Sequence, residues 1–132
     1  MKFILVSHGG FSKGLLESVQ MLVGQQEDIE AYTLMPHEQP AALEERLRNE
    51  IENTDDEIIF FTDLFHGSPF NVVVSLMRDH EFHHITGINL PLMVEAIMKR
   101  NMGASADEIC DSIIELAPGT IVDVGKYFTQ ED

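Results

Sequence analysis

The chain alternates short apolar runs with segments of helical periodicity. Residues 2–6 and 57–62 carry unbroken apolar runs, which are typical of strands buried on both faces. Residues 29–33 alternate apolar and polar side chains, which indicates a half-exposed strand at the edge of a sheet. Residues 82–88 predict a fourth strand.

Between these runs, apolar residues recur every three or four positions, as they do on one face of a helix. Several helix boundaries carry their own signals, such as a capping serine, a terminating glycine or a proline in the first turn. The first predicted helix starts at a cap on Ser12 and ends before Gly24, and the second covers residues 41–53. The third contains residues 70–77, and the fourth starts near Pro91. The last runs from a Ser105–Glu108 capping box through Ala117.

This alternation of strands and helices predicts an α/β fold: a doubly wound, mainly parallel sheet with helices on both faces. The flavodoxin-like strand order 2-1-3-4 is predicted, because it places the two strands with unbroken apolar runs in the centre of the sheet. Residues 120–124 are a candidate for a short fifth strand. No linker or repeat interrupts the pattern, so residues 1–132 are interpreted as a single domain.

Composition narrows the function classes. The formal net charge is -15, with only eight Lys and Arg residues, which argues against nucleic acid and against an anionic membrane surface. The same charge suits a partner with a basic patch, or simply solubility. The single cysteine, Cys110, excludes an internal disulfide and fits a reducing cytoplasm. No apolar run is long enough for a signal peptide or a membrane span.

Two loops after buried strands carry the candidate chemistry. SHGG follows the first strand and TDLFHGSPFN follows the third. Ligands of open α/β sheets bind beyond the carboxyl ends of strands at the switch in strand order, so His8, Asp63 and Ser68 are expected to converge. An imidazole whose one ring N–H is held by a carboxylate keeps a free lone pair on the other nitrogen. Ser68-Pro69 predicts an N-cap and first helical residue, with N–H groups that suit an anion.

Taken alone, His8 fits a packing residue, a metal ligand or a nucleophile. Gly9 and Gly10 let the backbone approach a ligand closely. The pattern of a histidine nucleophile, an orienting carboxylate and an anion cradle suits a phosphohistidine, and there is no GxGxxG or Walker A motif to compete with it. His83 and His84 enter a strand on opposite faces, which disfavours a shared metal ion.

Three segments together resemble the mannose-family enzyme IIA domain of the bacterial phosphoenolpyruvate-dependent sugar phosphotransferase system. They are ILVSHGGFSKGLLES, FFTDLFHGSPFN and ITGINLPLMVEA, and the resemblance covers nearly the whole chain. It implies that His8 is phosphorylated, that Asp63 holds its imidazole, and that Ser68 helps to bind the phosphoryl group. We expect Gly9, Gly10 and Gly67 to border that group. Family members often carry Trp or Gly in the loop where this chain has His66, so His66 is an additional candidate for the site.

The resemblance also implies partners and location. Phosphate would come from the carrier protein HPr and pass to a IIB component, which serves membrane IIC and IID subunits during sugar uptake. The family resemblance implies a cytoplasmic homodimer without a cofactor, in which the C-terminal strand can pair across subunits. Two alternatives use the same site: a IIA-like subunit that feeds a dihydroxyacetone kinase, and a regulatory module that signals through its phosphorylation state.

Overall fold

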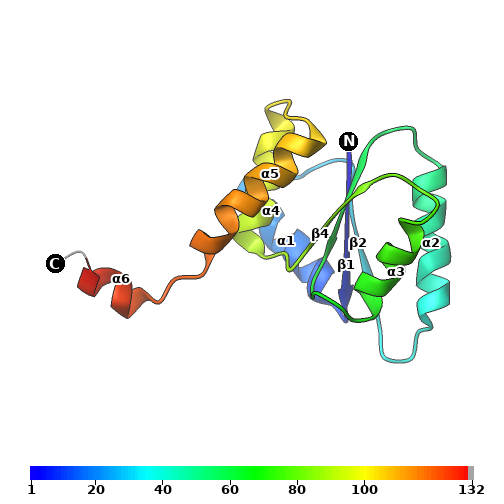
Figure 1. Ribbon diagram of the computed structural model, residues 1–132, viewed down its shortest axis with the longest axis horizontal. Coiled ribbons are helices and arrows are strands. Elements are labelled where there is room, and N and C mark those ends of the chain that lie inside the picture. Colours follow the sequence, from blue (N-terminus) through cyan, green and yellow to red (C-terminus); the bar gives the residue numbers. More distant parts are fainter. Residues whose placement is uncertain (131–132) are drawn as a thin grey trace.

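The computed structural model describes residues 1–130, and its centre is a four-stranded, all-parallel sheet (Figure 1). The strands are β1 (Lys2–His8), β2 (Ile29–Leu34), β3 (Ile58–Thr62) and β4 (His83–Thr86). Their order is β2-β1-β3-β4, which confirms the predicted order. The strand ends also agree with prediction within two residues. The largest differences are at the carboxyl ends of β1, which is two residues longer than predicted, and of β4, which is two residues shorter.

Helices cover both faces of the sheet. The helices α1 (Phe11–Val23), α4 (Leu90–Asn101) and α5 (Ala106–Leu116) lie on one side, and α2 (Pro40–Glu52) and α3 (Ser68–Leu76) lie on the other (Figure 1). The predicted capping box of α5 is present, with Ser105 and Glu108 hydrogen-bonded reciprocally. None of the helices within residues 1–130 is long and apolar enough to cross a membrane.

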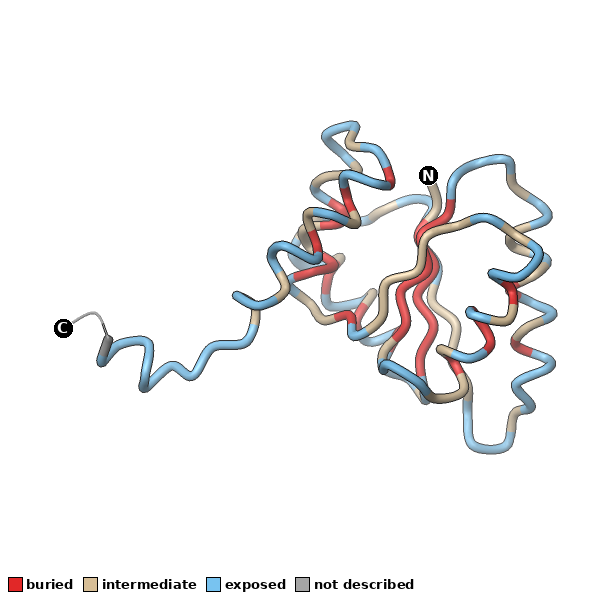
Figure 2. The backbone as a smooth tube through the Cα atoms, in the orientation of Figure 1, coloured by how far each residue is buried: buried red, intermediate tan, exposed pale blue. Residues whose placement is uncertain are grey.

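Two hydrophobic cores follow from the alternation of side chains along the strands. Phe3 and Leu5 of β1 pack with α1, α4 and α5, whereas Ile4 and Val6 pack with α2 and α3. The central strands β1 and β3 therefore form the most buried part of the chain (Figure 2). This double burial explains why the central strands read as continuous apolar runs, and it makes the sheet a rigid base for the loops at its carboxyl edge.

The prediction that Ser12 caps α1 is wrong. Gly10 occupies the N-cap position, and Ser12 is a buried residue inside the helix. Its hydroxyl donates to the Tyr32 carbonyl of β2 at 2.8 Å, while its backbone N–H donates to Ser7 Oγ at 2.7 Å. Ser7 thus satisfies an N–H group that the first helical turn leaves free, and it ties α1 to the end of β1.

The candidate fifth strand is also not found within the described chain. Ala117–Thr120 form a short 3-10 helix, η1, and Val124 begins the helix α6 (Val124–Gln130). Ile121 has extended backbone but is 85% exposed, on a segment that projects away from the sheet (Figures 1 and 2). A strand needs a neighbour for its backbone groups, and this segment has none among residues 1–130. Its exchange in a dimer stays a prediction.

His84 of β4 is a partly buried histidine that contacts Thr62 of the neighbouring strand. Its Nε2 lies 2.8 Å from Thr62 Oγ1, and the Thr62 hydroxyl itself donates to Thr86 Oγ1. The hydroxyl therefore accepts from the Nε2–H of a neutral ring. Burial lowers the pKa of His84 from its ordinary 6.5 to about 4.

We expect His84 to make the protein less stable in mild acid. Between pH 6.5 and 4 the unfolded chain binds a proton at this histidine and the folded chain does not, so the free energy of unfolding falls as the pH is lowered. The slope from this residue approaches about 1.4 kcal/mol per pH unit. Urea unfolding between pH 7 and 4 should show that His84→Gln has a shallower dependence than wild type. His83→Gln is the control and should keep the wild-type slope, and equal slopes in all three proteins would contradict the assignment.

Candidate functional site

His8 is the last residue of β1, at the carboxyl edge of the sheet. The side chains of β1 alternate, and the strand is buried from Phe3 to Ser7, but the His8 side chain is 48% exposed. The next residue, Gly9, extends the ladder by donating its N–H to the Leu34 carbonyl at 2.9 Å, with a positive φ of 53°. This turn ends the strand and leaves the His8 imidazole at the mouth of the sheet.

Asp63 holds both the backbone and the ring of His8. Its Oδ2 lies 2.9 Å from the His8 backbone nitrogen and 2.8 Å from His8 Nδ1. An ionised carboxylate only accepts hydrogen bonds, so in the neutral ring Nδ1 carries the proton and Nε2 keeps its lone pair. The Asp63 side chain is 14% exposed. Its Oδ1 is buried without a hydrogen-bond partner among the described residues.

The loop that connects β3 to α3 closes on the other side of the imidazole. A Cβ atom on Gly67 would lie 3.1 Å from His8 Cε1 and 3.3 Å from Nε2. Gly67 also has a φ of 105°, which other residues adopt only with strain. The glycine is therefore required twice, by the backbone turn and by the close approach to the free ring nitrogen.

Ser68 begins α3, but its predicted role as N-cap is wrong. Gly67 is the N-cap, Ser68 is the first helical residue and Pro69 the second. The first N–H groups of a helix have no partner within it, so the N–H of Ser68 and that of Phe70 are free to meet an anion. Pro69 has no N–H to leave unsatisfied. The expected helix start is present, shifted by one residue.

An open hollow of about 400 Å³ joins these groups. His8, Gly9 and Ser68 line it together with residues of the loop after β2 and the start of α2, and Gly10 lies outside it as the N-cap of α1. The residues that sequence reasoning missed are Leu34, Met35, Pro36, Glu38 and Pro40. Strand order could have indicated them, because β2 is the neighbour of β1 and ends at the same edge.

The lining of this hollow contains no Lys or Arg side chain. Its only carboxylate, Glu38, is engaged locally: Oε1 accepts from the Met35 backbone N–H at 2.9 Å, and Oε2 lies 3.7 Å from Arg46. Among the groups at the site, the N-terminal end of α3 contributes positive potential through its backbone N–H groups. A negatively charged ligand in this hollow would meet backbone dipoles, and no Lys or Arg side chain lines the hollow to pair with it.

His66 does not line this hollow. Its ring stacks on Phe65, with centroids 4.0 Å apart, and meets the edge of Phe70 at 5.4 Å. Two further histidines have partners away from the site: His80 lies 3.3 Å from Glu52, and His83 lies 3.7 Å from Asp107. Across the described part of the chain, no three metal-binding side chains gather in one place.

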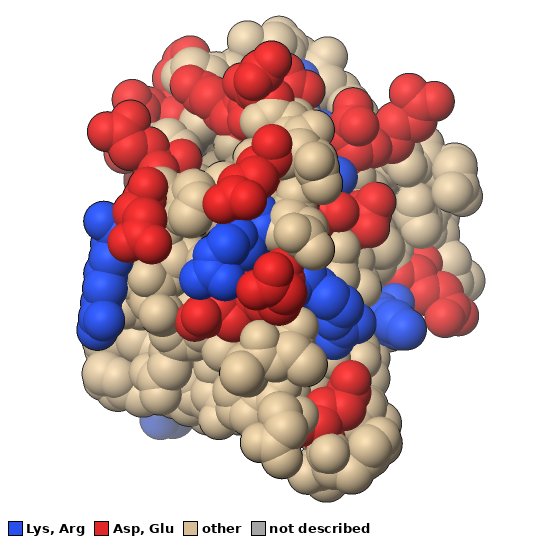
Figure 3. Space-filling model, turned by 90° about the vertical axis from the view of Figure 1, so that its right-hand side faces the viewer, with Lys and Arg blue, Asp and Glu red and all other residues tan. Residues whose placement is uncertain are grey.

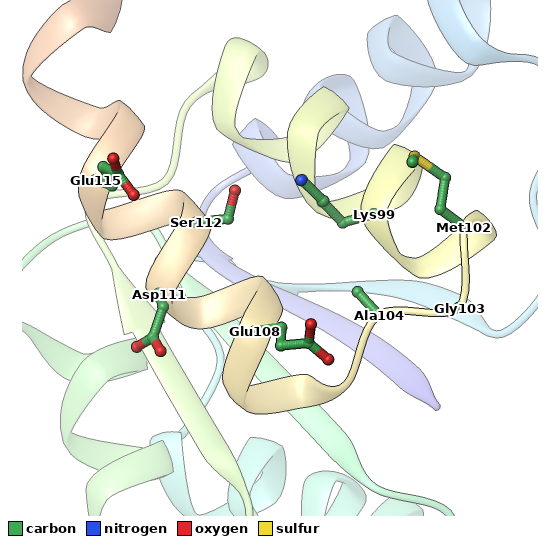
Figure 4. A pocket seen from close by; sticks show the side chains of 8 residues that line it. All are labelled: Lys99, Met102, Gly103, Ala104, Glu108, Asp111, Ser112 and Glu115. Carbon is green, nitrogen blue, oxygen red and sulfur yellow. The ribbon is translucent and has the colours of Figure 1, made fainter.

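A second hollow, of about 530 Å³, lies at the other end of the molecule between α4 and α5 (Figure 4). Lys99 and Ser112 point toward its interior, and three carboxylates border it, those of Glu108, Asp111 and Glu115. It shares no residue with the His8 site. The free lone pair, the orienting carboxylate and the helix start are all found at the carboxyl edge of the sheet, so that edge is the candidate site.

Fold and site together define a class: doubly wound α/β proteins that carry a carboxylate-oriented histidine beside a helix N-terminus at the switch in strand order. Residues 2–114 match the family described as the PTS system fructose IIA component. The chain belongs to this family, the mannose-family IIA components of the phosphoenolpyruvate-dependent sugar phosphotransferase system.

The relatives agree with this assignment. The mannose-specific EIIAB component of Escherichia coli K12 is 30% identical over 115 residues, which are 85% of this chain and 36% of that protein. The chain thus spans about a third of the length of such EIIAB relatives. The sorbose-specific EIIA component of Klebsiella pneumoniae is 31% identical over 116 residues, 86% of this chain and 84% of that protein. The crystal structure of EIIA from Streptococcus agalactiae has a TM-score of 0.87 at 30% identity and covers 95% of this chain and 98% of that one.

We expect Gly67→Ala to displace the His8 imidazole. The added methyl group would press on Cε1 and Nε2, and the positive φ alone costs about 1–2 kcal/mol for a residue with a side chain. Imidazole ¹⁵N and ¹³C NMR signals of His8 should shift, and the free energy of unfolding should fall.

Gly103→Ala is the matched control. Gly103 has a φ of 87°, and its added Cβ would meet nothing within 4 Å. It should lose a similar free energy of unfolding from backbone strain and leave the His8 signals unchanged. Identical His8 spectra in Gly67→Ala and wild type would show that the contact is unimportant.

Proposed function

We propose that the chain is a cytoplasmic phosphohistidine carrier, acting as one phosphotransfer domain over residues 1–132. His8 accepts a phosphoryl group from HPr and passes it to a IIB component, which serves IIC and IID membrane subunits in sugar uptake. The observation that carries this proposal is the contact of Asp63 with His8 Nδ1, which leaves Nε2 free beside the start of α3. Membership in the IIA family supports the system in which it acts.

The transfer step needs no proton to leave the site. The lone pair of His8 Nε2 forms a bond to phosphorus as the bond between phosphorus and the donor's histidine nitrogen breaks. The His8 ring gains a positive charge and keeps its Nδ1–H, while the donor ring loses its positive charge and becomes neutral. Asp63, at 2.8 Å from Nδ1, stabilises the charge that develops on the ring. The reverse sequence delivers the phosphoryl group to the acceptor.

The phosphoryl oxygens need donors, and the loop and helix start supply them. The Ser68 hydroxyl and the free N–H groups of the first turn of α3 are suited to this role, since the helix begins beside Nε2. Gly9 and Gly67 leave room for a ligand against the backbone. We assign Gly10 to a supporting role at the N-terminus of α1.

Partner binding has to be transient, and the surface charge suits that. The net charge of -15 favours partners with basic faces and speeds their encounter. Figure 3 shows the side of α2 and α3, where Lys and Arg side chains lie among Asp and Glu side chains. The exposed apolar residues of the C-terminal segment, Ile121, Val122, Tyr127 and Phe128, are consistent with a homodimer in which this segment packs on a second copy.

Incubation with phosphoenolpyruvate, enzyme I and HPr should place one acid-labile phosphate on each chain. His8→Ala should abolish the label, and His66→Ala should retain it, because His66 does not line the hollow at His8. Intact-protein mass spectrometry measures the added phosphate. A label that persists in His8→Ala, or that is absent from wild type, would overturn the proposal. Chase of the labelled chain with a purified IIB component or with a dihydroxyacetone kinase subunit then identifies the acceptor.

Asp63 variants should separate orientation from charge. Asp63→Ala removes the acceptor of both His8 hydrogen bonds, and we expect transfer from phosphorylated HPr to slow by roughly tenfold to a hundredfold, the size of a lost charged hydrogen bond. Asp63→Asn keeps an acceptor oxygen but not the charge, so its transfer rate should lie between those of wild type and Asp63→Ala. Rapid-quench kinetics measures the rates, and circular dichroism checks the fold. Equal rates for Asp63→Ala and wild type would exclude this role.

A further inference from the structure

The loop from Asp63 to Gly67 holds the His8 ring at both of its ends. Asp63 Oδ2 binds Nδ1 at 2.8 Å, and Gly67 lies against Cε1 and Nε2. Only three residues separate them, Leu64, Phe65 and His66. The conformation of these three residues therefore sets the distance between the group that orients the imidazole and the backbone that faces its free nitrogen.

His66 makes the turn in this loop with a strained backbone. Its φ is 68°, and the only other residue with a side chain and a positive φ in the described chain is Asp28. Positive φ is uncommon for residues other than glycine and is retained where the surroundings enforce it. Because Gly67 follows with a φ of 105°, two successive left-handed residues turn the chain back toward His8.

A cluster of three rings holds His66 in this conformation. The His66 ring stacks on Phe65 with an interplanar angle of 17°, and both rings meet the edge of Phe70, at 5.4 Å and 5.3 Å. Phe70 lies in the first turn of α3 and its ring is 5.3 Å from that of His84. His84 in turn contacts Thr62, the residue that precedes the loop. The contacts thus run from the end of the loop back to its beginning.

We propose that His66 is a positioning residue for the phosphoryl transfer at His8, an inference that rests on the proposed function. Its ring, packed against Phe65 and Phe70, stabilises the left-handed turn that places Gly67 and the start of α3 against the imidazole. The ring lies outside the hollow at His8, so it acts through the loop and does not contact the phosphoryl group. An aromatic ring without a titratable group should therefore replace it.

The test compares three variants at position 66 and its partner. His66→Phe keeps a ring for the stack, and it should keep the single-turnover rate of transfer from phosphorylated HPr within about threefold of wild type. His66→Val loses the ring and is a β-branched residue at positive φ, and it should slow transfer by about tenfold to a hundredfold, with little change in the HPr concentration for half-maximal rate. Phe70→Leu removes the edge contacts without changing the backbone at 66, and it should slow transfer in the same direction.

Asp28→Val is the matched control, because Asp28 has a φ of 55° at the opposite end of the sheet. It introduces the same backbone strain and should leave the transfer rate unchanged. The His8 imidazole ¹⁵N signals of the unphosphorylated proteins give a second readout, and they should move in His66→Val and Phe70→Leu but not in His66→Phe or Asp28→Val.

Two results would overturn the inference. If His66→Phe is as slow as His66→Val, the imidazole of His66 acts chemically and not by position. If neither His66→Val nor Phe70→Leu changes the transfer rate and the His8 signals, the ring cluster does not position the site. Failure of wild type to accept phosphate would overturn the proposed function instead, and the His8 signals would still test the positioning.

Discussion

The site depends on one carboxylate oxygen, Oδ2 of Asp63, which accepts hydrogen bonds from both the backbone and the ring of His8. The backbone bond fixes where β1 ends relative to β3, and the ring bond fixes how the imidazole is turned. Strand register makes this possible. The pairing of β1 with β3 ends at Val6 and Thr62, while β1 continues beside β2 for two more residues. Asp63 leaves the ladder just where its side chain can reach back to His8.

The rest of the fold keeps this geometry rigid. An apolar core lies between each face of the sheet and the helices that cover it. The fully buried side chains of β1 and β3 contribute to both cores. The buried hydroxyls of Ser7 and Ser12 add a polar tie between β1, α1 and β2 just before the site. The loops at the carboxyl edge therefore start from fixed points, and the short loop from Asp63 to Gly67 has few conformations that satisfy both of its ends.

The parts of the fold that follow from hydrophobic periodicity could be predicted from the sequence. The features that depend on tertiary contacts, such as the caps of α1 and α3, were predicted incorrectly. Strand order and the convergence of His8 with Asp63 followed from buried apolar runs and the general rule for parallel sheets. The cap of α1 could not be predicted, because Ser12 turns inward to the Tyr32 carbonyl, a partner that only the folded chain brings near. Ser68 lies one position further into α3 than predicted, because Gly67, with a positive φ, occupies the N-cap. Residues 120–124 were predicted as a strand from their composition, yet no neighbouring strand in the described part of the chain pairs with them.

The absence of a side-chain cation around the His8 hollow has an energetic consequence for a relay. A carrier that neutralised a phosphoryl group with its own arginines would hold it in a deep free-energy well and release it slowly. Backbone N–H groups and a hydroxyl carry no net charge, so the phosphoryl group is stabilised less on such a carrier and keeps a high group-transfer potential. In that arrangement, the cations of each successive partner, and not those of the carrier, decide in which direction the phosphate moves.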